Sequence, residues 1–259
     1  YHLISIAKRA NHKTVTIMGG PNIRLDSGSI CEFMKHRPNL DYYIPLEGEA
    51  PFSDLVGRLL TGEEAPSVPG AFKLVNDGAQ YEEADVKGKS REIDLPSPYL
   101  SGWLDPFLKN PHLIPLLETN RGCPFGCVFC VWGIAALAKV RRRTLEDVFN
   151  EVDYIANNSV GQQHWIVCDA NFGILPRDLE IAKRIRAIRE TTGYPVNVAL
   201  FHSKNTSSRN IEISAVLGDH AKGHVAVQSL DTEVLEHSGR KSMKLSEFER
   251  HIDSFKAQG

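Results

Sequence analysis

The second half of the chain alternates strand patterns with helical patterns, and this alternation limits the folds open to it. Apolar runs typical of strands occupy residues 114–119, 164–168, 196–201 and 224–229. Helical patterns lie between them, which predicts consecutive βα units with parallel strands and helices covering the sheet. A (β/α) barrel and an open doubly wound sheet both accommodate four such units.

Each of these strand patterns is apolar along its body and polar where it ends. In strand order, the polar ends are the cysteine run 123–130, Asp169 and Asn171, His202 and Lys204, and Gln228 and Ser229. Active residues gather at the carboxyl ends of parallel strands in both candidate folds. The pattern therefore predicts one site built from all four ends.

Signals for helix starts and ends support the predicted βα units. Thr144 followed by Asp147 resembles a capping box ahead of an apolar stripe. The helical pattern at residues 181–188 is ended by Gly193. A weaker pattern lies at residues 211–216, and a last helix is expected at 248–255.

The first 65 residues predict a smaller α/β region. Strand patterns at residues 14–18 and 41–46 alternate with helical patterns, and a glycine-bearing turn follows each strand. The two turns are Gly19-Gly20-Pro21 and Glu47-Gly48-Glu49. In a parallel sheet both would lie at the edge where ligands bind, although a glycine turn by itself is often only a tight turn.

Residues 66–113 differ from the flanking regions in their sequence pattern and are interpreted as a linker. Prolines recur through this stretch, and Asn76-Asp77-Gly78 between two short apolar runs predicts a hairpin. The domains expected are therefore 1–65, a linker at 66–113, and 114–259.

Three of the five cysteines are spaced Cys-x₃-Cys-x₂-Cys, at Cys123, Cys127 and Cys130. No fourth cysteine or histidine follows within about thirty residues. Three thiolates can hold three irons of a four-iron cluster and leave the fourth iron open to a small molecule.

Two other uses of these cysteines remain open. A structural zinc site would need a fourth ligand, which His112 could supply, and it favours paired Cys-x₂-Cys spacing. A disulfide framework suits an odd number of cysteines without a secretory signal less well. Cys31 and Cys168 are expected to be small buried apolar residues.

The stretch 118–133, with its three cysteines, resembles the radical S-adenosylmethionine (SAM) superfamily. The resemblance implies that Cys123, Cys127 and Cys130 ligate a [4Fe-4S] cluster whose open iron binds SAM. Reductive cleavage of SAM would then give a 5′-deoxyadenosyl radical, with the cofactor carrying the chemistry. It also implies a partial (β/α) barrel, of which this chain holds four units.

The same resemblance implies a set of SAM contacts. Its members lie next to the last cysteine or at the carboxyl ends of the later strands: Phe129, Asp169, Asn171, Lys204, Gln228 and Ser229. For Phe129 core packing is the alternative, and for Asp169 and Asn171 a capping or turn role.

Several features resemble the branch of that superfamily with a cobalamin-binding domain. They are the two glycine turns, the run Pro96-Ser97-Pro98-Tyr99, the runs at 118–123 and 169–173, and the segment 228–240. The resemblance implies that residues 1–65 are the C-terminal part of a Rossmann-like cobalamin-binding domain. Gly19, Gly20, Pro21, Glu47, Gly48 and Glu49 would then contact cobalamin.

That branch is rich in methyltransferases acting on unactivated carbon or phosphorus, which is the activity implied here. A radical rearrangement or cyclisation without methyl transfer is the first alternative. A non-catalytic module that binds metal or cobalamin is the second. The implied partners are a small-molecule or peptide substrate and an electron donor such as flavodoxin or ferredoxin.

Composition excludes some partners. Thirty basic residues balance 32 acidic ones, so no nucleic-acid partner is expected. No apolar run approaches the ~20 residues that span a bilayer, so no membrane is expected and the location predicted is cytoplasmic. The chain starts at Tyr1 within a helical pattern, and we interpret it as a fragment.

Overall fold

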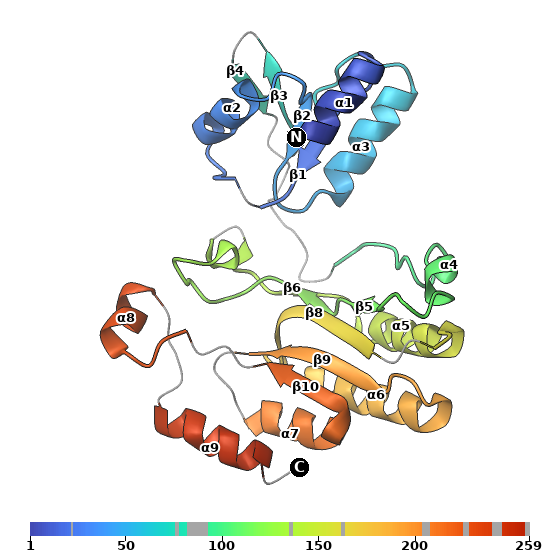
Figure 1. The fold of residues 1–259 in the computed structure, drawn as a ribbon, viewed down its shortest axis with the longest axis vertical. Helices are drawn as coiled ribbons and strands as arrows, with labels where there is room; N and C mark the ends of the chain where they lie inside the picture. Colours follow the sequence, from blue (N-terminus) through green and yellow to red (C-terminus); the bar gives the residue numbers. More distant parts are fainter. Residues whose placement is uncertain are drawn as a thin grey trace. The chain divides into compact units, whose positions relative to one another are not determined.

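A computed structural model describes the chain in two compact units, Tyr1–Lys89 and Ser90–Gly259 (Figure 1). The residues described are 1–21, 23–75, 78–81, 93–134, 137–161, 164–203, 208–224, 228–239 and 245–256. Each unit has its own sheet and its own apolar core.

The first unit is a four-stranded sheet with three helices. In chain order its elements are α1 (His2–Ala10), β1 (Ile17–Gly19), α2 (Ser27–Lys35), β2 (Tyr42–Ile44), α3 (Glu49–Leu60), β3 (Phe72–Val75) and β4 (Gly78–Tyr81). The strand order is β1-β2-β3-β4, in which β1 and β2 are parallel and the last two pairings are antiparallel. The two predicted strands are present but shorter, at 17–19 instead of 14–18 and at 42–44 instead of 41–46. The hairpin is confirmed, although turn residues 76–77 lie outside the described part.

Strand β2 is buried on both faces, as expected of a parallel strand covered by helices. Tyr43 packs with Ile30 and Met34 of α2, whereas its neighbours Tyr42 and Ile44 pack with Leu55 of α3. The helices α2 and α3 therefore cover opposite faces of the sheet (Figure 1).

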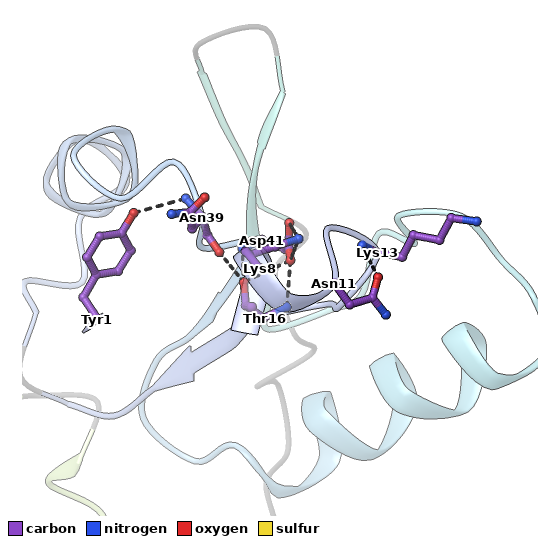
Figure 2. Close-up of polar contacts among 7 residues, drawn as sticks. All are labelled: Tyr1, Lys8, Asn11, Lys13, Thr16, Asn39 and Asp41. Carbon is purple, nitrogen blue, oxygen red and sulfur yellow. Dashed lines mark hydrogen bonds and ion pairs between the residues drawn. The ribbon is translucent and has the colours of Figure 1, made fainter. Parts of the chain in front are cut away.

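A polar network closes the amino end of this sheet (Figure 2). The carboxylate of Asp41 accepts hydrogen bonds from the backbone N–H of Thr16 at 2.7 Å and from Lys8 Nζ at 2.9 Å. The Thr16 hydroxyl in turn donates to the carbonyl of Asn39. These contacts join α1 and the starts of β1 and β2, and they leave the glycine turns at the opposite end of the strands.

The predicted linker is divided between the two units. Its hairpin, β3 and β4, extends the sheet of the first unit. Its later part belongs to the second unit, because Tyr99 and Leu108 are members of that unit's core. The Tyr99 hydroxyl also donates to the carbonyl of Leu116 at 2.9 Å and accepts from its N–H at 3.0 Å.

The second unit is a parallel sheet with helices along it. Its longer elements are α5 (Leu145–Asn158), β8 (His164–Phe172), α6 (Asp178–Thr192), β9 (Asn197–His202), α7 (Ser208–Leu217), β10 (Ala221–His224), α8 (Thr232–His237) and α9 (Leu245–Lys256). Its short elements are α4 (Asp105–Leu108), β5 (Leu116–Leu117), β6 (Asn120–Arg121), the 3-10 helix η1 (Val131–Gly133), β7 (Arg141–Arg142) and the 3-10 helix η3 (Gly218–His220).

The sheet order is β10-β9-β8-β5, with every pairing parallel, so the βα units follow one another across the sheet. Helices α5, α6 and α7 pack successively beside it (Figure 1). Thr144 caps α5 by accepting from the N–H of Asp147, and Gly193 ends α6 in a left-handed conformation, as predicted.

Several predicted strands of this unit differ in their bounds, and β5 covers only two residues of the predicted 114–119. Strand β8 continues to Phe172, so Asp169 and Asn171 lie within its last part and not beyond it. The fourth strand starts earlier than predicted and is described over Ala221–His224, whereas Gln228 and Ser229 lie outside it, before α8. Residues 225–227 of the predicted strand lie outside the described part of the chain. The pattern around residue 224 is apolar enough for a strand, but pairing with β9 holds Ala221 to His224 in register.

Candidate functional site

The three cysteines lie on one loop whose ends are tied together. Strands β6 and β7 pair antiparallel, with Asn120 opposite Arg142 and Arg121 opposite Arg141. Just inside this neck, the N–H of Cys123 donates to the carbonyl of Leu137 at 2.9 Å. Since β6 follows β5 closely, the loop starts at the carboxyl end of the parallel sheet, as the sequence predicts.

Glycine is required at two points of the loop. Gly122 has φ +106°, and a Cβ there would collide with the carbonyl of Lys139 across the neck. A Cβ on Gly133 would collide with the backbone carbonyl of Cys127. At Gly126, by contrast, a Cβ would meet nothing within 4 Å. The close contacts at Gly122 and Gly133 fix the position of the cysteine backbone, because a side chain at either glycine would push the loop away from the facing carbonyl.

The three cysteines are buried to different degrees. All three are free; Cys123 and Cys127 are buried, whereas Cys130 is half-buried. The N–H of Cys130 donates to the carbonyl of Cys127 at 3.1 Å, which turns the chain between them. The N–H of Val128 donates to the carbonyl of Ser238 at 3.0 Å, so the end of α8 supports the loop.

Asp169 on β8 anchors the segment that leads into the loop. Its buried carboxylate accepts from the N–H of Thr119 at 2.7 Å, the N–H of Asn120 at 3.1 Å and the side-chain amide of Asn120 at 2.7 Å. The hydroxyl of Thr119 supplies a fourth hydrogen bond. Burial raises the pKa of Asp169 to about 7, against the lowering effect of the hydrogen bonds from Thr119 and Asn120.

This carboxylate is therefore engaged within the protein. Both oxygens have two donors each, and the side chain has no exposed surface. In the structure Asp169 holds the cysteine segment against β8, and its contact with SAM stays a prediction. Arg177 adds to this support by donating to the carbonyls of Thr119 and Arg143.

Asn171, two residues further along the same face of β8, reaches the loop directly. Its side-chain Nδ2 donates to Cys123 Sγ at 3.2 Å. The other amide atom, Oδ1, is buried and has no hydrogen-bond partner among the described residues. An unpaired buried acceptor beside a cysteine is what a bound polar ligand would satisfy.

The remaining predicted SAM contacts are placed less centrally. Phe129 is about half exposed beside Cys130. Gln228 is exposed, and Ser229 is half-buried with its hydroxyl accepting from the N–H of Asp231 at 3.1 Å. Lys204 lies outside the described residues.

Two further side chains lie near the ends of β8 and β9, and one of them differs from its prediction. His202 is buried at the end of β9, with its Nε2 3.5 Å from the Ser214 hydroxyl. Cys168 is exposed, so the prediction that it is buried is wrong. Because side chains alternate along a strand, Cys168 faces away from the side of β8 that carries Val167 and Asp169.

The two glycine turns of the first unit lie at one edge of its sheet. Gly19 pairs in register with Ile44, and the N–H of Gly20 donates to the Ile44 carbonyl at 3.1 Å. The hydroxyl of Tyr43 donates to the Gly20 carbonyl at 2.6 Å. Gly20 has φ +124°, and a Cβ there would meet nothing within 4 Å. Pro21, Glu47, Gly48 and Glu49 continue from these strand ends, with Gly48 as the N-cap of α3.

The sequence interpretation gave no role to Thr119, Asn120, Arg177 or Asp178. Asp178 is fully buried and accepts from the N–H groups of Gly173 at 2.8 Å and Leu175 at 3.0 Å, which shapes the turn after β8. Burial raises its pKa to about 6. Polar residues are common at such positions in any sequence. Only the fold shows that Thr119, Asn120 and Asp178 are buried around the end of β8, with Arg177 half-buried beside them.

The donor set fits an iron–sulfur cluster. Within the described ranges, no three His, Cys, Asp or Glu side chains converge on one point as they do around a single metal ion. A four-iron cube spreads its thiolate ligands further apart than one ion does, and it requires only three cysteines when one iron is left open. Three free cysteines on one glycine-shaped loop, with an unpaired Asn171 oxygen beside them, meet that requirement.

Comparisons with known proteins agree with this geometry. No family model matches the chain. A 2-(S-pantetheinyl)-carbapenam-3-carboxylate methyltransferase from Streptantibioticus cattleyicolor is 33% identical over 95% of this chain and 36% of that protein. The cobalamin-dependent radical SAM methyltransferase TokK from Streptomyces tokunonensis is 33% identical over 98% of this chain and 38% of that protein.

Solved structures show the same fold. The radical SAM methyltransferase TsrM from Kitasatospora setae, with cobalamin and a [4Fe-4S] cluster bound, matches 100% of this chain and 50% of its own, with a TM-score of 0.73 and 15% identity. The cobalamin-dependent SAM radical enzyme OxsB, with aqua-cobalamin and SAM bound, matches 99% of this chain and 37% of its own, with a TM-score of 0.68 and 19% identity. The α/β class predicted from the sequence is confirmed, and the chain spans little more than a third of the length of the two methyltransferases that are 33% identical to it.

Proposed function

We propose that this chain, which is homologous to part of the cobalamin-dependent radical SAM methyltransferases, carries the cluster site and part of the cobalamin site of such an enzyme. The observation that carries the proposal is the loop of Cys123, Cys127 and Cys130, held at the carboxyl end of a parallel sheet by Asp169 and Asn171. The reaction proposed is methyl transfer to an unactivated carbon or phosphorus.

The cysteine loop would hold the cluster. Bound there, a [4Fe-4S] cluster with one open iron supplies the electron for reductive cleavage of SAM. The protein contributes position and shielding: Cys123 and Cys127 are buried, and the neck between β6 and β7 keeps the loop closed. Cys130, half-buried, lies nearest to solvent of the three.

Among the expected SAM contacts, Asn171 has the strongest support. Its Oδ1 is a buried acceptor with no partner among the described residues, suited to the ammonium group of SAM. Phe129 offers an aromatic surface beside Cys130, suited to adenine. Gln228 and Ser229 precede α8, whose C-terminal end supports the cysteine loop, and they remain candidates for the ribose together with Lys204.

The first unit would form part of the cobalamin site. Gly19, Gly20 and Pro21 follow β1, and Glu47, Gly48 and Glu49 follow β2, at the edge where ligands bind in open α/β sheets. The space above Gly20 would let a flat, bulky ring approach the backbone. The domain division proposed is 1–65, 66–113 and 114–259, with the hairpin of the middle segment joining the first sheet.

The partners proposed follow from this chemistry. A small-molecule or peptide substrate would accept the methyl group, and flavodoxin or ferredoxin would supply electrons in the cytoplasm. The balanced charge of the chain gives no support for nucleic acid. No helix in the described ranges is both long and apolar enough to cross a bilayer.

The proposed activity has a direct test. Protein containing this chain, reconstituted anaerobically with iron and sulfide and given dithionite and SAM, should release 5′-deoxyadenosine, measured by chromatography. Omitting dithionite is the matched control and should abolish release, because cleavage needs the electron. Purified protein with one zinc, no acid-labile sulfide and no SAM cleavage would contradict the proposal and favour a non-catalytic module.

The cobalamin site has its own test. In protein purified from cobalamin-replete cells, Gly20→Val should lower the co-purifying cobalamin absorbance several-fold, because its side chain would occupy the space above the strand end. Gly62→Val is the matched control: Gly62 also has a positive φ, +89°, and open space, but it ends α3 away from that edge. Equal cobalamin in both variants would remove the first unit from the proposed site.

A further inference from the structure

We infer that Asn171 is a positioning residue for the cluster, which sets its reduction potential by donating a hydrogen bond to the sulfur of Cys123. The inference rests on the proposed function, since it concerns the cluster that the three cysteines would hold. It goes further by assigning the two atoms of one amide to two tasks: Nδ2 to the ligand sulfur and Oδ1 to SAM.

The geometry is specific to one cysteine. Nδ2 of Asn171 lies 3.2 Å from Cys123 Sγ, and both side chains are almost fully buried. Among the hydrogen bonds recorded for the described residues, no other side-chain amide donates to any of the three cysteine sulfurs. A buried hydrogen bond is stronger than an exposed one, because no water competes for the donor.

Rigid surroundings hold the amide in place. Asn171 lies on β8 between Asp169, which is fixed by four donors, and Gly173, whose N–H donates to Asp178. Phe172 pairs in register with His202 of β9. The residues before and after Asn171 are therefore held by hydrogen bonds. Such a position suits a side chain that must keep a fixed distance to a ligand sulfur.

The expected effect follows from charge. Reducing a cluster adds negative charge that is shared by its sulfur ligands, and a hydrogen bond to a sulfur stabilises that charge. The donor therefore raises the reduction potential, and its loss lowers it. SAM cleavage starts from the reduced cluster, and the higher potential would make it easier for the electron donor to reduce the cluster.

The test uses two variants of nearly the same size as asparagine. In the anaerobically reconstituted protein, Asn171→Leu and Asn171→Val both remove the donor to Cys123 without adding a charge or a new donor. At a fixed ambient potential each should lower the ratio of reduced to oxidised cluster about tenfold, which for a one-electron couple is about 59 mV. The readout is a redox titration followed by electron paramagnetic resonance, with iron and sulfide content measured alongside.

Asn210→Ala is the matched control. Asn210 is equally buried nearby, but its amide donates to the carbonyl of Ser203 at 3.3 Å, not to a cysteine. Its replacement should leave the potential unchanged even where it lowers stability.

An unchanged potential in both Asn171 variants with full iron content would overturn the inference and leave the proposed function standing. Loss of the cluster from both, while Asn210→Ala retains it, would overturn it too and assign Asn171 a purely structural role. A parent protein without a cluster would overturn the proposed function itself.

Discussion

Replacing any one of Cys123, Cys127 and Cys130 by alanine should abolish the cluster, reducing iron from about four per chain to near zero after anaerobic reconstitution. The physical reason is the ligand count. A four-iron cluster held by three thiolates has no spare protein ligand, and within the described ranges no nearby His, Cys, Asp or Glu completes another set. Iron and acid-labile sulfide analysis, together with the visible absorbance of the cluster, measure the effect.

The two other cysteines are the controls. Cys31 lies on α2 in the first unit, and Cys168 is exposed on the side of β8 opposite Asp169. Cys31→Ala and Cys168→Ala should keep the full iron content, since neither residue lies on the loop. A cluster that survives the loss of Cys123, Cys127 or Cys130 would contradict the ligand assignment, and loss of iron in Cys168→Ala would point to Cys168 as a ligand.

The placement of the three cysteines on one loop after a strand could be predicted from the sequence, because its signal is local. Ligand spacing within eight residues states how many thiolates are available, and the apolar run before them places them after a strand. The glycines at 122 and 133 belong to the same local signal. Their necessity, however, arises from the carbonyls of Lys139 and Cys127, which only the folded loop brings close.

The contacts that tie the loop to β8 could not be predicted in the same way. Asp169 and Thr119 are fifty residues apart. An aspartate at a strand end suits ligand binding, capping and structural anchoring equally well in sequence. Its burial and its four donors show the anchoring contacts, whereas Asn171, on the same face, retains one oxygen without a partner among the described residues. One strand thus carries an anchoring residue and a candidate ligand residue two positions apart.

Strand bounds were the least predictable part of the fold. The sequence pattern predicts that the fourth strand starts at residue 224, yet it starts at Ala221, because pairing with β9 determines where the extended segment begins. The sequence also did not show how the linker segment is shared between the two units. Prolines mark irregular chain, but they do not show that the hairpin joins one sheet while Tyr99 packs into the other core.

The anchoring role of Asp169 predicts a large loss of stability on truncation. Asp169→Ala leaves the N–H groups of Thr119 and Asn120 and the amide of Asn120 buried without their acceptor. Each such donor costs about 1–3 kcal/mol, so the free energy of unfolding of the second unit should fall by about 3 kcal/mol or more. Urea denaturation followed by tryptophan fluorescence measures it, because all three tryptophans, at positions 103, 132 and 165, belong to that unit.

Asp231→Ala is the matched control, since Asp231 accepts from two backbone N–H groups at the exposed start of α8. It should lose only about 1 kcal/mol, the usual effect of an N-cap.

The loss in Asp169→Ala should also depend on pH. Because burial raises the pKa of Asp169 from 3.8 to about 7, the folded parent binds more protons than the unfolded chain between these values, and its stability falls as the pH rises through them. The variant lacks this dependence, so its deficit should be larger at pH 5 than at pH 8. A deficit that grows with pH would show that the four donors outweigh burial and keep Asp169 ionised in the folded protein.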